Sequence, residues 1–446
     1  MKVDIKPYDL GLSGWQGILP PREPTGALVD DLETDYTIIG AGFAGLAAAR
    51  RLRQLEPESS IAIVEAREIG EGPIGRNSGF MIDLPHNLTR SDYASSDSDD
   101  RKQIELNRLA INYLAEAKSE LDLPDSCFKK TGKINAAATQ NGHRHNQSYA
   151  RHLEQLNEPF ELLSSSQMSS LSGSRYYCGG LRTPGTVLLQ PVEFARGFAN
   201  QLSGSKNCQT FENSAVCEYF KLHDGWLMKT NKGSIRSGKV ILAVNGLIET
   251  FGFFKQRLMH INLYGSMTRA LNSDEIAQLG GSREWGFTPS DPLGSTLRRI
   301  TGEAGDRILI RNQCTYEPDL SLPLNRLDLI RKHHLNSFQA RFPQLSQVDM
   351  EYCWSGRLCL SRNDAWALGE LDTGLYAACC QNGLGITRGT IAGIIAAEMA
   401  SNGENSSMFG KYSLNVKPSK LFPRPFMTLG SRAYLKFGQW MAGREV

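Results

Sequence analysis

The pattern of apolar residues is most regular between Asp35 and Glu65. The run Tyr-Thr-Ile-Ile at 36–39 has the length and β-branching of a buried parallel strand. Strong helix formers follow at 46–52, with apolar side chains at helical spacing. A second apolar run, Ile-Ala-Ile-Val, fills 61–64 and leads directly into Glu65. This pattern predicts a strand, a helix and a second strand in succession.

A glycine-rich turn joins the first predicted strand to the helix. Gly40, Gly42 and Gly45 stand in a GxGxxG spacing, and Glu65 follows 20 residues after the last of them. In such turns the first glycine allows a tight bend, the second lets backbone approach a pyrophosphate, and the third lets helix and strand pack closely. The helix N-terminus attracts a diphosphate, and Glu65 suits a ribose 2′-hydroxyl. Because every part occurs in the expected order, the stretch indicates dinucleotide binding rather than a flexible glycine loop.

The rest of the chain alternates between helical and strand-like patterns. Further helices are predicted at 103–121, 144–156, 327–342 and 390–400, and strands at 176–189, 239–246, 258–270 and 307–311. The segment 128–139 is typical of a hairpin. Prolines and glycines crowd 14–24 and 66–80, which argues against regular structure there. In the first of these, we expect Trp15 to anchor the segment by burial; lining a substrate entrance is the alternative.

Composition excludes several classes of protein. The 446 residues are too many for one compact core, and 49 basic against 47 acidic residues give no nucleic-acid surface by net charge. The nine cysteines lack CxxC or metal-binding spacing and predict reduced thiols in a cytoplasmic protein. No run reaches the roughly 18 apolar residues of a membrane span, and the first residues lack the apolar core of a signal peptide. The pair His333-His334 has no third ligand nearby, so no metal is expected.

The residues after the second predicted strand resemble a known family. Residues 70–80 read GEGPIGRNSGF, and together with 35–65 they resemble the D-amino-acid oxidase and sarcosine oxidase superfamily of flavoproteins, within it the gamma-glutamylputrescine oxidoreductase type. Segments 239–246, 351–358 and 375–387 resemble further segments of that family, and 212–216 resembles a family strand whose backbone, at Val216, pairs with the adenine. The resemblance implies an α/β fold: a Rossmann-type, glutathione-reductase-like FAD-binding domain with an interleaved α+β substrate domain on a mixed or antiparallel sheet.

The resemblance also implies how the chain is divided. It gives an N-terminal arm at 1–34, an FAD-binding domain at 35–95, 190–250 and 351–410, a substrate domain at 96–189 and 251–350, and a basic, aromatic tail at 411–446.

FAD, held without a covalent bond, is the implied cofactor. The residues assigned to it are Gly40, Gly42, Phe43, Ala44, Gly45, Glu65, Ala66, Arg67, Gly75, Arg76, Asn77, Ser78, Gly79, Val216, Asn245, Gly246, Trp354, Gly356, Arg357, Asn382, Gly383, Leu384, Gly385, Ile386 and Thr387. The helix at 390–400 would direct its N-terminus at the flavin ring, where reduction places negative charge.

Two departures from the family pattern stand out. Gly72-Pro73-Ile74-Gly75 replaces the family's Gly-Ala-Ser-Gly, which removes one backbone donor and a hydroxyl near the diphosphate. The pair Cys379-Cys380 stands where the family commonly has glycines. It is a redox pair or, since adjacent cysteines rarely form a comfortable disulfide, two packed thiols.

With FAD, the implied reaction is oxidation of a C–N bond in a small amine or amino acid. A hydride passes to flavin N5, and the resulting imine hydrolyses. The candidates that face the substrate are His260, Tyr264 and Arg311, and Arg357 and Arg388 are candidates for the fork that clamps a carboxylate. Ordinary structural ion pairs or contacts with water are the alternative for each. Oxidation of a hydroxy acid, or an accessory flavoprotein subunit without its own turnover, are alternative functions.

The tail at 417–446 mixes basic residues with Leu, Phe, Tyr and Trp. Such a mixture can lie on an anionic membrane surface, which would suit an enzyme that passes electrons to quinone. The interpretation that we favour is a terminal helix that docks on the protein's own surface. The expected partner is a small amine or amino acid and not a nucleic acid, and an oligomer is left open.

Overall fold

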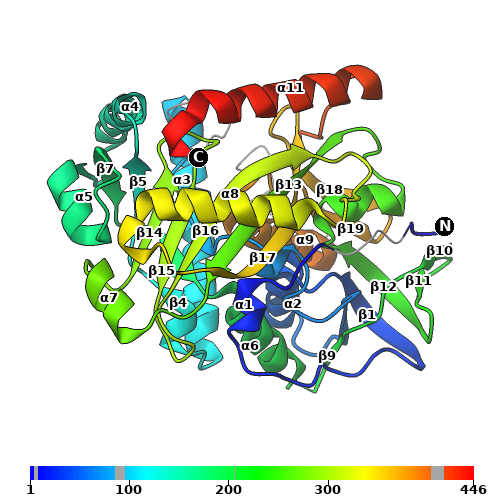
Figure 1. Cartoon of the computed structure of the whole chain (residues 1–446). Coiled ribbons are helices and arrows are strands. Elements are labelled where there is room, and N and C mark those ends of the chain that lie inside the picture. The colour runs from blue at the N-terminus through cyan, green and yellow to red at the C-terminus, as the bar shows by residue number, and fades with distance from the viewer. Residues whose placement is uncertain (5–8, 86–95, 205, 403–415) are drawn as a thin grey trace.

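The computed structural model describes residues 1–4, 9–85, 96–204, 206–402 and 416–446 (Figure 1). The helices in these residues are α1 (Gly14–Gly17), α2 (Phe43–Leu55), α3 (Asp97–Glu120), α4 (Gln140–Leu156), α5 (Ser165–Ser172), α6 (Pro191–Ser203), α7 (Ser273–Leu279), α8 (Arg326–Arg341), α9 (Thr387–Asn402) and α11 (Arg424–Ala442). Two larger sheets and one small sheet complete the fold.

The first sheet carries the predicted strand–helix–strand unit. Its strands run in the order β10 (Glu218–Leu222), β11 (Gly225–Lys229), β12 (Ser234–Leu242), β1 (Asp31–Ile39), β2 (Ile61–Val64) and β9 (Cys208–Phe211), and β19 (Leu375–Cys379) and β18 (Ala367–Asp372) extend it beside β12. β1 is parallel to both β12 and β2, and β2 is parallel to β9. This is the Rossmann-type arrangement that the sequence predicts.

Small residues let α2 and α9 pack closely on this sheet. Ala47, Ala48 and Ala49 are fully buried in α2. Gly393 of α9 approaches so closely that an added Cβ would stand 2.0 Å from the Ala44 carbonyl oxygen. The two helices therefore fix the position of the glycine turn at the start of α2.

The second sheet is mixed, as the resemblance implies. Its order is β17 (Met350–Ser361), β13 (Leu258–Thr268), β16 (Arg307–Tyr316), β15 (Thr296–Ile300), β14 (Trp285–Pro289), β5 (Lys133–Ala137), β7 (Gly179–Thr183) and β6 (Glu161–Ser164). The pairs are antiparallel except β14 with β5. α8 crosses this sheet (Figure 1), where Phe342 stacks on Trp285 with ring centroids 6.2 Å apart.

The third sheet shows that the hairpin prediction for 128–139 is wrong. β4 (Phe128–Lys129) pairs with β8 (Val187–Leu189), which also pairs with β3 (Phe80–Met81). β5 pairs with β7 and β14 instead. Gly132, between the two strands, has φ of +73° and lies against the Thr183 carbonyl, so the chain turns there into another sheet.

Several predicted boundaries shift for local reasons. Ser13 caps a single helical turn, α1, within the stretch predicted to be irregular. Pro73–Gly75 form one 3-10 turn and Phe80 begins β3, so the 66–80 loop is not wholly irregular either. The helix predicted at 103–121 is confirmed but begins at Asp97, because Ser96 accepts a hydrogen bond from the Asp99 N–H.

Two predicted strand assignments also change. β9 ends at Phe211, so 212–216 is not a strand; Glu212 turns back to bind the N-terminal arm. β17 contains the segment 351–358 that the resemblance places in the FAD-binding domain, yet it pairs with β13 in the second sheet. The domain boundaries otherwise stay a prediction.

Candidate cofactor and active site

A cavity of about 1380 Å³ extends from the glycine turn after β1 to helix α11. Ligand pockets commonly measure about 300–1,000 Å³, so this cavity has room for a dinucleotide and a small substrate together. Its lining comes from both larger sheets: residues after β1, β2 and β12 on one side and residues of β13, β16 and β17 on the other.

Each glycine of the turn fills the place that its spacing predicts. Gly40 has φ of +105°, and an added Cβ would lie 2.7 Å from the Ala243 carbonyl oxygen. A Cβ on Gly45 would lie 1.9 Å from the Gly40 oxygen, so helix and strand touch there. Among the described residues, nothing lies within 4 Å of a Cβ on Gly42, which lines the cavity. The backbone at Gly42 therefore faces open space at the helix N-terminus, which suits a diphosphate.

Glu65 is held at the end of β2 by the turn itself. One carboxylate oxygen accepts a hydrogen bond of 2.8 Å from the Ala41 N–H, and the other accepts one of 3.2 Å from the Arg67 N–H. Burial raises the pKa of Glu65. Its side chain lines the cavity beside Ala66 and Arg67, where a ribose would follow the diphosphate.

Arg76 joins the loop after β2 to the N-terminal arm and to β17. Its Nε donates to the Glu71 carbonyl at 2.6 Å, and its Nη1 donates to the carbonyls of Leu10, Gly11 and Ser355 at 2.9–3.1 Å. Burial lowers the pKa of Arg76. The side chain predicted to touch the cofactor thus also holds three separate segments around the cavity.

Asn77 shapes the same loop from within. Its Nδ2 donates to the Ile74 carbonyl at 2.6 Å, and its Oδ1 accepts from the Gly79 N–H at 2.8 Å. The Asn77 carbonyl accepts a hydrogen bond of 2.7 Å from the indole of Trp15, which is fully buried. Trp15 is therefore an anchor of the arm, as predicted.

The cavity gathers most, but not all, of the residues assigned to FAD. Those that line it are Gly40, Gly42, Phe43, Ala44, Glu65, Ala66, Arg67, Arg76, Asn77, Ser78, Val216, Asn245, Gly246, Gly356, Arg357, Gly383, Leu384, Gly385 and Ile386. Among the described residues, those outside the lining are Gly45, Gly75, Gly79, Trp354, Asn382 and Thr387. Trp354, for example, lies behind the loop, where its indole donates to the Arg76 carbonyl at 3.2 Å.

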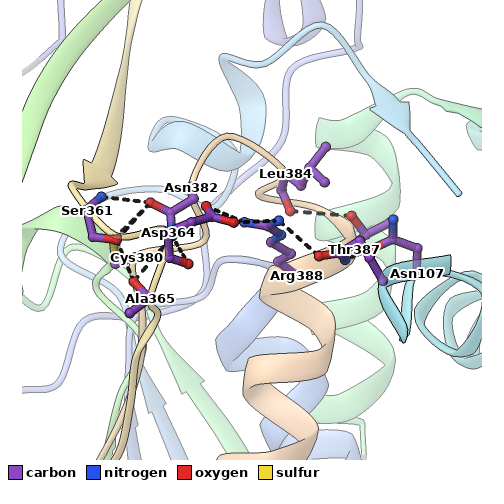
Figure 2. Close-up of polar contacts among 10 residues, drawn as sticks. Asn107, Ser361, Asp364, Ala365, Cys380, Asn382, Leu384, Thr387 and Arg388 are labelled. Atoms are coloured by element: carbon purple, nitrogen blue, oxygen red, sulfur yellow. Dashed lines mark hydrogen bonds and ion pairs between the residues drawn. The ribbon is translucent and has the colours of Figure 1, made fainter. Parts of the chain in front are cut away.

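Asn382 lies outside the lining and joins two segments next to it by the hydrogen bonds drawn in Figure 2. Its Oδ1 accepts from the Ser361 N–H at 2.7 Å, and its Nδ2 donates to the Asp364 carbonyl at 2.9 Å. These bonds tie the loop after β19 to β17. Gly385 and Ile386 line the cavity immediately before α9 begins at Thr387, so the N-terminus of this helix faces the cavity as predicted.

The predicted catalytic residues fall into two groups. His260 and Arg357 line the cavity. The His260 Nε2 is 2.5 Å from a Glu249 carboxylate oxygen, and the Arg357 Nε is 3.0 Å from an Asp9 carboxylate oxygen. Both side chains are therefore positioned by acidic partners from other segments.

Tyr264 and Arg388 lie outside the cavity. The Tyr264 side chain is fully buried on the other side of β13, and its hydroxyl is 2.7 Å from that of Thr315. Arg388 forms an ion pair of 3.0 Å with Asp364, and it also donates to Gln103 at 2.9 Å (Figure 2 shows the pair with Asp364). Arg388 thus forms the structural ion pair given as its alternative, whereas Tyr264 is buried against Thr315 and meets neither the cavity nor water.

Three cysteines near the predicted flavin loop form a buried group. Cys359 lines the cavity, and its thiol is 3.0 Å from the Asn245 Oδ1. The neighbouring Cys380 thiol, together with burial, raises the pKa of Cys359, and burial raises that of Cys379 to about 12. Cys379 and Cys380 are free, fully buried thiols, which agrees with packing rather than a disulfide.

Other parts of the lining carry no sequence signal. Leu293 and Thr296 reach the cavity from the β14–β15 region, and Met427, Ser431 and Leu435 reach it from α11. None belongs to a motif, because the second sheet and the terminal helix meet the nucleotide site only in the folded chain.

Comparisons with known proteins agree with this geometry. A family model described as FAD dependent oxidoreductase (DAO) matches residues 35–399. The probable oxidoreductase OrdL of Haemophilus influenzae is 24% identical over 392 residues, which cover 84% of this chain and 85% of that protein. Gamma-glutamylputrescine oxidoreductase of Escherichia coli is 21% identical over 406 residues, with coverage of 84% and 85%.

Solved structures share the fold. Glycine oxidase from Geobacillus kaustophilus superposes with a TM-score of 0.70 at 17% identity, over 87% of this chain and 100% of that one. The family match covers most of the present chain, and the open backbone at Gly42 and the position of Glu65 fit a dinucleotide. The chain therefore belongs to the DAO family of FAD-dependent oxidoreductases, and FAD is its cofactor.

Proposed function

We propose that this protein oxidises the C–N bond of a small amine or amino acid. The observation that carries the proposal is one continuous cavity, which begins at the dinucleotide turn and continues to His260, Arg311 and Arg357 of the second sheet. When bound, FAD accepts a hydride at N5 from the carbon beside the amine, and the resulting imine hydrolyses to a carbonyl compound. The chain itself then has to bind the cofactor, orient the substrate and limit the access of water.

The first part of the cavity supplies the cofactor contacts. The N-terminus of α2 at Gly42 and Phe43 would hold the diphosphate, and the Glu65 carboxylate would hold the ribose hydroxyls. The backbone near Val216 would pair with the adenine. Gly383–Ile386, ahead of α9, would place amide donors and the positive end of a helix beside the flavin ring.

The second part of the cavity supplies the substrate contacts. Arg311 on β16 and Arg357 on β17 come from the two strands that flank β13, which carries His260. Their planar guanidinium groups match the geometry of a carboxylate. Arg311 lies opposite Gly265 and Arg357 opposite Asn262, three residues apart on β13, so the two side chains leave opposite faces of the sheet. We therefore assign the face that carries Arg311, the substrate wall, to the acidic end of the substrate, with the amine carbon directed toward the flavin.

The proposal is tested by anaerobic mixing of the purified flavoprotein with secondary amines, polyamine derivatives, D- and L-amino acids and hydroxy acids. We expect the flavin absorbance to bleach with amines or amino acids that carry a carboxylate. Readmission of oxygen then separates an oxidase, which recovers its colour quickly, from a dehydrogenase.

Two results would contradict the proposal. Bleaching by hydroxy acids alone would move the reaction to a C–O bond. If no compound bleached the flavin while dithionite still reduced it, the accessory-subunit alternative would replace an independent enzyme.

A further inference from the structure

The terminal helix α11 turns its apolar face outward. Phe426, Leu429, Phe437 and Trp440 are 61–73% exposed, and they project from one side of the helix. The opposite side carries small or polar residues such as Thr428, Ser431, Gly438 and Gln439. A surface helix of a globular protein ordinarily has the reverse arrangement, with its apolar stripe toward the core. This outward stripe therefore needs an explanation.

Both ends of α11 are fixed to the body of the protein. Before the helix, the Leu421 N–H donates to the Gln256 carbonyl at 2.8 Å, and Arg257 donates to the Pro418 carbonyl at 2.6 Å. After it, the buried carboxylate of Glu445 accepts hydrogen bonds of 2.9 and 2.8 Å from the N–H groups of Ala138 and Thr139.

The middle of α11 is also held. Gln439 donates to the Cys314 carbonyl at 3.0 Å, and Gly438 lies against Leu293 so closely that a Cβ there would meet its Cδ1 at 2.3 Å. The polar and small side of the helix is thus used for docking. The apolar stripe cannot turn inward without breaking these contacts.

The charge of the same segment is one-sided. Between 416 and 446 the basic residues are Lys417, Lys420, Arg424, Arg432, Lys436 and Arg444, and Glu445 is the one acidic residue. Glu445 is buried by its contacts with Ala138 and Thr139 and does not offset the exposed charge. Arg424 forms an ion pair of 3.0 Å with Asp319, so the remaining positive charge rests on the other basic residues of the segment. Arg432 and Lys436 are exposed beside the apolar stripe.

We propose that α11 is a membrane-surface helix that lies in the interface of an anionic lipid bilayer. Exposed aromatic and leucine side chains flanked by lysine and arginine are the pattern of helices that lie flat in the headgroup region. A second copy of the chain is less suitable, because a symmetric contact would bring the basic residues of two α11 helices together. Within the part of the chain that the structure describes, each helix is too short or too polar to cross a bilayer.

The position of α11 connects this surface to the cavity. Met427, Ser431 and Leu435 line the cavity from the docked side of the helix, and Phe426 and Phe437 of the apolar stripe border it as well (α11 is the red helix at the top of Figure 1). A bilayer that covers the stripe would therefore lie at the border of the proposed substrate chamber.

The test is co-sedimentation of the holoenzyme with vesicles of phosphatidylcholine alone and of phosphatidylcholine mixed with phosphatidylglycerol. We expect binding to the anionic vesicles, which weakens as salt is raised, and little binding to the neutral ones. Leu429→Ser/Trp440→Ser should weaken binding at least about tenfold, because two exposed apolar side chains no longer enter the interface. Arg432→Gln/Lys436→Gln should reduce the dependence on anionic lipid.

A matched control removes exposed apolar residues elsewhere. Leu324 and Leu329 are 87% and 62% exposed outside α11, and Leu324→Ser/Leu329→Ser should bind vesicles like the wild type. Absence of the wild-type protein from anionic vesicles, or equal losses in the control and the α11 variant, would overturn the proposal. So would a dimer in sedimentation velocity that Leu429→Ser/Trp440→Ser dissociates, since the stripe would then bind a second copy.

Discussion

At the residue scale, the buried carboxylate of Glu212 joins three distant segments. Arg22 donates to both of its oxygens, and the N–H groups of Thr25 and Ile69 donate to it as well. Burial alone would raise the pKa of Glu212, but the hydrogen bonds from Arg22, Ile69 and Thr25 outweigh burial and hold the pKa below its ordinary value. Glu212 thus fastens the N-terminal arm to the loop that borders the cavity.

Removal of this charge should destabilise the protein. Glu212→Gln leaves Arg22 and two N–H groups with a poorer acceptor, and we expect a loss of about 3 kcal/mol in the free energy of unfolding near neutral pH. The pKa of Glu212 in the folded protein is below the ordinary 4.5. The difference in unfolding free energy between the wild type and Glu212→Gln should therefore be largest above about pH 4.5 and shrink as the pH falls through the folded pKa. Denaturant unfolding at several pH values measures it.

The exposed pair of Glu33 and Arg236 is the control. Its charged atoms are 4.0 Å apart, and Glu33 is largely exposed, so Glu33→Gln should change stability little at any pH. Equal unfolding midpoints for Glu212→Gln and the wild type would contradict the assigned role of Glu212.

A second residue-scale prediction concerns the arginines. Arg311→Lys should raise KM for a carboxylate-bearing substrate at least about tenfold, because a lysine replaces a planar fork with a point charge. Arg388→Lys should leave KM near the wild-type value, since Arg388 lies outside the cavity in an ion pair with Asp364. Steady-state kinetics compare the two variants. Similar KM changes in both would remove Arg311 from the substrate wall.

Sequence reasoning finds some of these residues and misses others for a physical reason. Gly40, Gly42 and Glu65 belong to one local unit, so their spacing alone predicts their roles. Glu212 and its partner Arg22 are 190 positions apart, and Asp9 meets Arg357 from the far end of the chain. Such pairs arise only when the folded chain brings separate segments together.

At the element scale, different glycines of the β1–α2 turn serve folding and cofactor binding. A Cβ on Gly45 would overlap the Gly40 oxygen, whereas a Cβ on Gly42 would enter open space in the cavity. Gly45→Ala should therefore destabilise the apoprotein by about 1–3 kcal/mol, as overpacking does. Gly42→Ala should fold nearly as stably but bind FAD more weakly, because the methyl group occupies the space for the diphosphate.

Thermal unfolding of the apoproteins and titration with FAD measure the two effects. We expect Gly45→Ala mainly to lower the unfolding temperature and Gly42→Ala mainly to weaken FAD binding. If Gly42→Ala bound FAD like the wild type, the diphosphate would have to lie elsewhere.

The positions of helices and strands are predicted better than the pairing of strands into sheets. The apolar pattern places the helix at 103–121 and the strands around 36–39 and 61–64 close to where the structure has them, and the helix at 327–342 also lies close to its predicted position. Sheet membership is not local, so β17 could not be assigned to the second sheet from its sequence. Pro73, which departs from the family loop, begins a 3-10 turn, where a proline is tolerated because the first position needs no N–H donor.

At the scale of the whole molecule, two sheets enclose one cavity and α11 borders it. The parallel sheet presents the dinucleotide turn, the mixed sheet presents His260, Arg311 and Arg357, and both meet at the same space. This arrangement fits a reaction in which the cofactor lies between its binding sheet and a separate wall for the substrate. The resemblance predicts the two-part architecture, and the tail's composition allows a docked terminal helix, but only the structure shows that this helix borders the cavity.

The most direct test of the central claim is a single anaerobic turnover with a carboxylate-bearing amine. Flavin absorbance is followed while a hydrazine reagent traps any carbonyl compound. The account predicts that the flavin bleaches and that one carbonyl compound forms for each flavin reduced. Bleaching without a carbonyl product, or no bleaching by any amine or amino acid, would contradict oxidation of a C–N bond by this protein.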